Sequence, residues 1–182
     1  MPEPITEYTP LYAHDGGRAR RAAWAAWVAA LSGALLFAGL IVAAPLLRAR
    51  GLFFLSQAIY QGFHAACHQM PERSFHLWGF PLAVCARCFG LYAGLLAGVV
   101  IYPLARPLMR ADAPHRRWLF AAALPTSVDF VLGLLGVWEN THGSRFVTAL
   151  LLGAVSAFYV VPGIVGLAHR YWPRHLRPAA SS

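Results

Sequence analysis

The chain has 182 residues, of which 58% are hydrophobic and only 12% are charged, and its formal net charge is +8. Because soluble domains average about 25% charged residues, this composition excludes an ordinary soluble domain. All 15 basic residues are arginines that flank apolar segments instead of forming a stripe, which argues against a nucleic-acid partner. We therefore expect a multi-pass protein of the plasma (inner) membrane, with the lipid bilayer as its first partner.

Four apolar segments are long enough to cross a membrane. About 20 predominantly apolar residues span the roughly 30 Å hydrocarbon core as a helix. The expected spans are residues 22–47, 88–105, 118–138 and 146–168. They form a single bundle at residues 22–168, between a mobile N-terminal tail of residues 1–21 and a basic C-terminal tail of residues 169–182.

Residues 51–70 carry no formal charge, yet they do not form an ordinary span. Four polar side chains recur there at steps of four, three and four, namely Gln57, Gln61, His64 and His68. This spacing places them on one face of a helix, opposite an apolar face. The predicted fold is therefore all-α, a polytopic bundle of four spanning helices plus one amphipathic or partly inserted helix before the second span.

Two of the expected spans carry small residues at four-residue spacing. They are Gly90, Gly94 and Gly98 in the second span, and Ala149, Gly153 and Ala157 in the fourth. Small residues at this spacing let two membrane helices approach closely. We expect both stripes to lie in helix contacts.

The third expected span contains Asp129 near its centre, four residues after Pro125. A carboxylate inside a membrane costs several kcal/mol unless it is paired, neutral or hydrated, and such residues are functional candidates. Asp129 is expected to pair with Arg87 or Arg145, to line a polar cavity, or to hold a proton.

The arginines also predict an orientation. Four spans place both termini on one side of the membrane, and with that side inside, ten arginines are cytoplasmic and five are not. The positive-inside bias therefore predicts cytoplasmic N- and C-termini, with the Cys/His segment 51–88 towards the non-cytoplasmic face.

All three cysteines, Cys67, Cys85 and Cys88, fall within 22 residues. The C-x-x-C spacing of the last two can chelate one metal ion, and three thiolates with one imidazole form a common zinc site. The candidate imidazoles are His68 and, as an alternative ligand, His64, because on a helix they would converge with Cys67. We predict a site for zinc or another soft-ligand metal.

Besides metal binding, two interpretations of the cysteines stay open, namely disulfide or thiol redox chemistry and inert packing. In an oxidising compartment they could form a disulfide, which leaves one thiol over. C-x-x-C at a helix N-terminus beside Arg87 also has the electrostatics of a redox motif, since both features favour a thiolate. The third interpretation is that the cysteines are buried and inert.

Three arginines, Arg73, Arg87 and Arg145, are expected at the same end of the bundle as the cysteines. Guanidinium groups match the oxygen pairs of phosphates and carboxylates. They could form a cradle for a lipid headgroup or another small anion. The alternative is that they extend towards the membrane surface or pair with Glu72 and Glu139.

Two motifs resemble a known family. They are the run Cys-His-Gln-Met-Pro-Glu-Arg-Ser-Phe from residue 67 and the run Cys-Ala-Arg-Cys-Phe-Gly-Leu-Tyr-Ala-Gly from residue 85. Together they resemble the membrane proteins of domain of unknown function 2085. The matching positions are Cys67, His68, Gln69, Pro71, Arg73, Ser74, Cys85, Arg87, Cys88, Gly90, Tyr92, Gly94, Asp129, Arg145 and Thr148.

The resemblance covers about residues 55–160, and the chain departs from the pattern at Ala83, where proline is usual, and at Ala149, where glycine is usual. Neither position is a proposed ligand. The resemblance favours His68 over His64 as the polar member of the cluster, and it implies no activity.

Three functions fit these features. The first is a metal cluster beside an Arg/Asp-lined polar pocket that binds or acts on an anion. The second is a membrane thiol-disulfide oxidoreductase in which Cys67 resolves the Cys85–Cys88 pair. The third is a small transporter or channel subunit with Asp129 on its path. The candidates for a catalytic role are Asp129, Arg73, Arg87 and Arg145, and the sequence leaves both enzyme activity and a homo-oligomeric state open.

Overall fold

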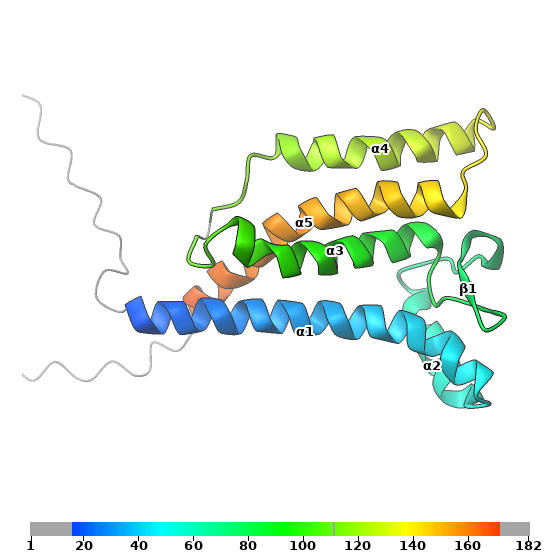
Figure 1. Cartoon of the computed structure of the whole chain (residues 1–182), viewed down its shortest axis with the longest axis horizontal. Helices are drawn as coiled ribbons and strands as arrows, with labels where there is room; N and C mark the ends of the chain where they lie inside the picture. The colour runs from blue at the N-terminus through cyan, green and yellow to red at the C-terminus, as the bar shows by residue number, and fades with distance from the viewer. Residues whose placement is uncertain (1–15, 111, 172–182) are drawn as a thin grey trace, which may run out of the picture.

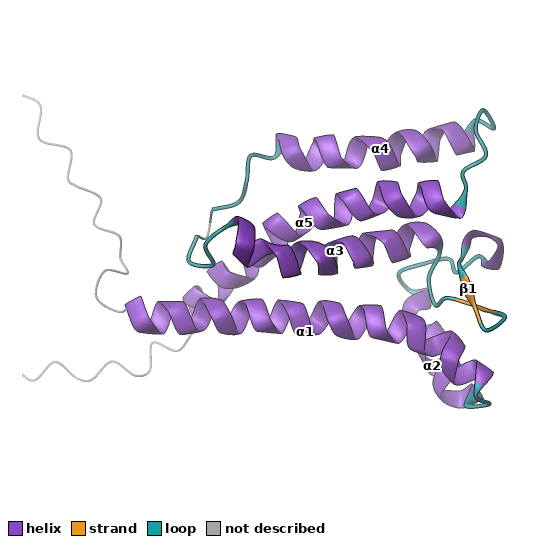
Figure 2. Ribbon diagram, viewed as in Figure 1, coloured by secondary structure: helices purple, strands orange, loops and turns teal. Residues whose placement is uncertain are grey.

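The structure is a computed structural model that describes residues 16–110 and 112–171. Its helices are α1 (Gly16–Ala49), α2 (Phe53–His64), α3 (Ala86–Ala105), α4 (Arg117–Leu134) and α5 (His142–Tyr171). A one-turn 3-10 helix at Pro71–Arg73 and a small antiparallel hairpin, β1 (His76–Leu77) and β2 (Phe80–Pro81), join α2 to α3. Figure 2 shows that the strands are confined to one end of an otherwise helical molecule.

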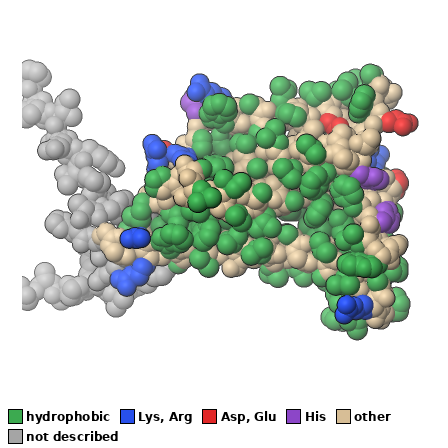
Figure 3. All heavy atoms as spheres, viewed as in Figure 1, with side chains coloured by type: hydrophobic (Ala, Val, Ile, Leu, Met, Phe, Trp, Pro, Cys, Tyr) green, Lys and Arg blue, Asp and Glu red, His purple; other side chains and the backbone are tan. Residues whose placement is uncertain are grey.

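Four of these helices are long and apolar enough to cross a membrane, at Ala19–Ala49, Ala86–Ala105, Arg117–Leu134 and His142–Ala168. α2 precedes the second of them, so the predicted all-α class of four spanning helices plus one further helix is confirmed. Apolar side chains cover the side of the bundle, whereas charged and histidine side chains gather near its two ends (Figure 3). The start of α1 and the end of α5 lie at the same end (Figure 1).

The helix ends differ from the expected ones for local reasons. α4 ends at Leu134, four residues before the predicted end, because Gly136 adopts a left-handed backbone conformation with φ of 68°. Glycine in this conformation commonly terminates a helix. α1 begins at Gly16, inside the predicted tail, since arginine and alanine are strong helix formers. Residues 1–15 and 172–182 of the two predicted tails lie outside the described residues.

α3 and α5 form the tightest pair in the bundle, and their small residues are the reason. A Cβ atom built on Gly94 would lie 2.8 Å from the carbonyl carbon of Leu150 and 2.9 Å from the nitrogen of Ala154. In the opposite direction, a Cβ on Gly153 would lie 2.9 Å from the nitrogen of Leu95. The two backbones are therefore in direct contact, which confirms the packing predicted from the small-residue stripes.

α2 lies against the end of α1, where the buried Ser56 hydroxyl donates a hydrogen bond of 2.9 Å to the Ala44 carbonyl. Gln57, Gln61 and His64 are exposed as predicted for the polar face, and Phe63 is buried. The expectation that His68 continues this face is wrong, because α2 ends at His64. Gln69 has a positive φ of 51° and Pro71 follows, and neither fits a continuing α-helix.

Candidate metal and anion site

The three cysteines meet at one point. Their sulfurs lie within 4.8 Å of one another. Cys85 is the residue before the first turn of α3, and Cys88 lies in that turn, so the start of the helix presents both sulfurs. Cys67 comes from the loop after α2 and is buried against an apolar cluster that includes Ile41 and Val84. This contact between distant segments is the one that the sequence predicted for a metal site.

Backbone N–H groups hold the Cys67 sulfur in place. It accepts hydrogen bonds from the Cys85 N–H at 3.2 Å and from the Gln69 N–H at 3.4 Å. The hydrogen bond from the Cys67 thiol, followed by that from the Cys88 thiol, lowers the pKa of Cys85 well below the ordinary value of a thiol, although burial opposes the shift. A thiolate is the form of cysteine that binds metal ions and attacks disulfides.

The predicted histidine ligands lie outside this group of sulfurs. Within the described part of the chain, the set of ligand atoms within 4.8 Å of one another consists of the three cysteine sulfurs. His64 and His68 are exposed. The predicted convergence of these two side chains with Cys67 on one helix does not occur, because α2 ends at His64. His68 nevertheless lines the cavity beside the cysteines.

Gln69 shapes the loop that carries Cys67. Its side-chain amide donates hydrogen bonds of 2.7 Å to the carbonyls of Tyr60, on α2, and of Ala83, just before α3. The Tyr60 hydroxyl in turn donates a hydrogen bond of 2.5 Å to the Pro81 carbonyl. The loop is therefore fixed between α2 and the approach to Cys85. Gln69 belongs to the first cysteine motif, but the motif indicates no role for its side chain.

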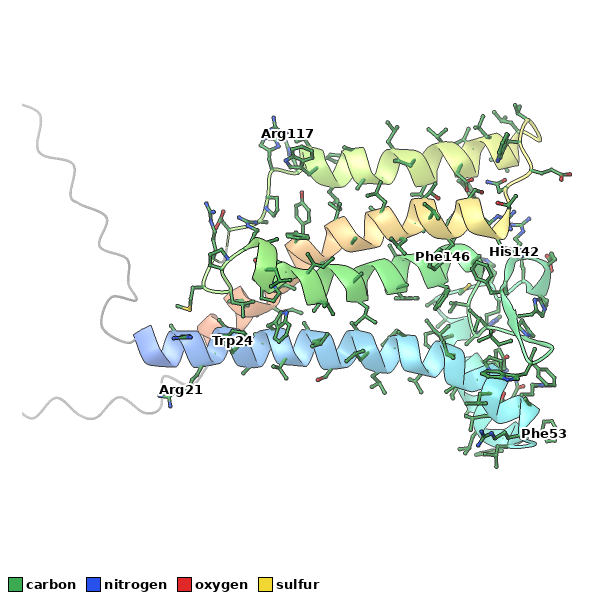
Figure 4. The ribbon with its side chains drawn as sticks, in the orientation of Figure 1. Arg21, Trp24, Phe53, Arg117, His142 and Phe146 are labelled. Atoms are coloured by element: carbon green, nitrogen blue, oxygen red, sulfur yellow. The ribbon has the colours of Figure 1, made fainter. Side chains whose placement is uncertain are left out.

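An aromatic cluster ties the same loop to the bundle. Phe75 packs edge-to-face on Phe89 of α3 and on Phe146 of α5. It also lies against His142, whose ring nitrogen is 3.1 Å from the Glu72 carbonyl. Figure 4 shows the labelled His142 and Phe146 at the end of α5 that meets the loop. The position of Arg73 is thereby linked to both helices.

The cysteines open onto a cavity of about 650 Å³ that residues of the loop, α3, α4 and α5 line. All three predicted arginines line it, and Asn140 joins them from the α4–α5 connection. The part of its wall that α4 provides is apolar and includes Phe130 and Leu134.

The Asp129 carboxylate, 7% exposed, pairs with the Arg87 guanidinium at 2.5 Å. This is one of the two pairings expected for it. Arg87 also stacks over the Phe130 ring, with its central carbon 5.3 Å from the ring centre, and Asn140 donates a hydrogen bond to the Asp129 backbone carbonyl. The pair joins the start of α3 to α4 beside the cysteines.

Arg73 and Arg145 differ from Arg87 in their ion pairing. Among the described residues, neither has a carboxylate oxygen within 4.0 Å, so the alternative pairings with Glu72 and Glu139 do not form. Arg73 is exposed and Arg145 is half-buried. The guanidinium groups of Arg73 and Arg145 therefore face the cavity without a carboxylate partner among the described residues.

These features define an integral membrane protein with a cysteine cluster and an arginine-lined cavity at one end of its helical bundle. A family model described as "Predicted membrane protein (DUF2085)" matches residues 67–159, and the chain belongs to this family. The resemblance seen in the two cysteine motifs is thus confirmed.

Two archaeal relatives support the assignment. An uncharacterised protein of Methanocaldococcus jannaschii is 40% identical over 109 residues, which are 60% of this chain and 70% of the relative. An uncharacterised protein of Methanothermobacter thermautotrophicus is 33% identical over 91 residues, which are 50% of this chain and 80% of the relative. No solved structure matches the chain.

Proposed function

We propose that the protein binds a metal ion, with zinc as the first candidate, through Cys67, Cys85 and Cys88, and that this ion organises an adjoining pocket for an anion. The observation that carries the proposal is the meeting of three sulfurs within 4.8 Å, from two segments of the chain, at the wall of an arginine-lined cavity. Thiolates favour zinc, copper(I) and iron–sulfur centres over hard cations.

His68 is the proposed fourth ligand. It follows Cys67 directly and lines the same cavity, so a change of its side-chain rotamer could direct the imidazole towards the sulfurs. His64, at the end of α2, is the alternative. Four protein ligands would make the metal structural, whereas an exchangeable fourth position would let the ion polarise a bound anion.

A structural ion here would act as a cross-link. It would join the loop that carries Arg73 to the start of α3, which carries Arg87. Both arginines line the cavity, so the metal would fix their relative positions. In this proposal the metal maintains the pocket and the arginines bind the ligand.

The test is elemental analysis of the protein purified in detergent. We expect roughly one zinc ion per chain, lost in Cys88→Ser and retained in Ser127→Ala. Ser127, on the exposed surface of α4 outside the cavity, is a matched control for handling and folding.

Wild-type protein without metal, together with a dithiothreitol-sensitive crosslink between cysteines, would refute the proposal and favour the thiol-disulfide oxidoreductase. The transporter with Asp129 on its path ranks lower, because that carboxylate is already engaged by Arg87.

A further inference from the structure

The cavity beside the cysteines has two chemically different halves. Arg73, Arg145 and Asn140 provide a polar wall, and Phe130 and Leu134 provide an apolar one. The apolar wall belongs to a membrane-spanning helix, and its side chains are also part of the outer surface, since Phe130 is 53% exposed and Leu134 is 73% exposed. In a bilayer this outer surface meets lipid chains.

The arrangement of α4 leaves this side of the cavity accessible from the membrane. α4 packs along α5, and its contacts with α3 are few. The Arg87–Asp129 ion pair and the stacking of Arg87 on Phe130 link α3 and α4 at this end. Figure 1 shows α4 on the outside of the bundle, beyond α5.

The polar half carries two guanidinium groups that no carboxylate of the described residues pairs with. Asp129 balances Arg87, whereas Arg73 and Arg145 have no carboxylate within 4.0 Å among the described residues. The first turns of α3 and α5 lie at this end and contain no acidic residue. The positive helix ends therefore add to the two guanidinium groups.

We infer that the ligand is an amphiphilic phosphate, bound with its phosphate group between Arg73 and Arg145 and its hydrocarbon part against Phe130 and Leu134. The inference rests on the anion pocket proposed above and names its ligand class. Two forked guanidinium donors on separate elements suit a phosphate, which offers several oxygens in different directions. A free phosphate would use the polar wall alone and would leave the apolar wall without a role.

The experiment measures the binding of dioleoyl phosphatidic acid to the purified protein in mixed detergent micelles, by native mass spectrometry, with inorganic phosphate as competitor. We expect saturable binding that weakens about tenfold or more in Arg145→Gln and in Arg73→Gln, since each removes a charge-assisted contact. Arg73 is exposed, so its substitution tests the site even if the variant of the half-buried Arg145 misfolds. Arg116→Gln, at the exposed start of α4 and outside the cavity, is the matched control and should bind as the wild type does.

A second variant separates the two sources of phosphate. Leu134→Gln should weaken binding of phosphatidic acid, and millimolar inorganic phosphate should compete poorly with the lipid. If inorganic phosphate binds as tightly as phosphatidic acid, and Leu134→Gln changes neither affinity, the assignment of an amphiphilic ligand is overturned. Lipid binding that survives both Arg145→Gln and Arg73→Gln would overturn the phosphate site.

Zinc content is measured on the same samples. Protein that retains zinc and fails to bind phosphatidic acid refutes this inference alone. Protein that lacks any bound metal as purified refutes the proposed metal site, whatever its lipid binding.

Discussion

Replacement of Asp129 by asparagine removes the carboxylate that Arg87 faces at 2.5 Å and should destabilise the protein. Removal of one partner from a buried ion pair leaves an uncompensated charge and costs about 3–5 kcal/mol. Here the Asp129 side chain is 7% exposed, but that of Arg87 is 27% exposed, so water can partly solvate the remaining charge. We therefore expect about 2–3 kcal/mol, below the range for a fully buried pair.

The measurement is reversible unfolding in detergent, as a double-mutant cycle with Arg87→Gln. The double variant should recover part of the loss, since it removes the unpaired charge. Asp112→Asn is the matched control, because Asp112 makes the same type of pair with Arg106 and Arg110 at 57% exposure, where a surface ion pair contributes about 1 kcal/mol or less. Equal stability of Asp129→Asn and Asp112→Asn would refute the assignment of this pair as a structural bond between α3 and α4.

Two further predictions concern packing and the metal. Gly94→Ala places a Cβ against the α5 backbone and should lower the free energy of unfolding by about 1–3 kcal/mol. Gly33→Ala is the control, because its new Cβ meets nothing within 4 Å, and it should be neutral or stabilising. Thermal unfolding in detergent measures both variants. Equal melting of the two variants would contradict the described α3–α5 contact. Bound zinc should be released as the pH falls, because protons compete with the metal for the three thiolates. Elemental analysis after dialysis at stepwise lower pH measures this release. Full retention of zinc in acid would exclude a thiolate site.

The parts of the fold that depend on composition could be predicted from the sequence. The four spans follow from apolar length, and the α3–α5 contact follows from the spacing of Gly90, Gly94 and Gly98. Helix ends depend on single backbone conformations instead. The left-handed Gly136 ends α4 early, whereas Gly133 in the same apolar run stays helical, and the sequence does not show which of the two glycines adopts the left-handed conformation.

The candidate site, too, could be predicted only in part. The cysteine spacing predicted which sulfurs would meet, since C-x-x-C presents two of them on one turn. The partner of Asp129 could not be chosen, because Arg87 and Arg145 both lie at the same end of the bundle and only the packing of α4 decides between them. The role of the Gln69 side chain could not be predicted, because its two acceptors, the carbonyls of Tyr60 and Ala83, lie 9 and 14 residues away in the chain.

The backbone contact between α3 and α5 determines where the molecule can deform. Each glycine of α3 admits a carbonyl of the neighbouring helix into the space that a side chain would fill. Sliding or rotation of either helix would drive a carbonyl into the next side chain, so the two helices behave as one rigid body. A change in the shape of the cavity is therefore expected at α4 and not between α3 and α5, and the ion pair of Asp129 with Arg87 connects α4 to the segment that carries Cys85 and Cys88.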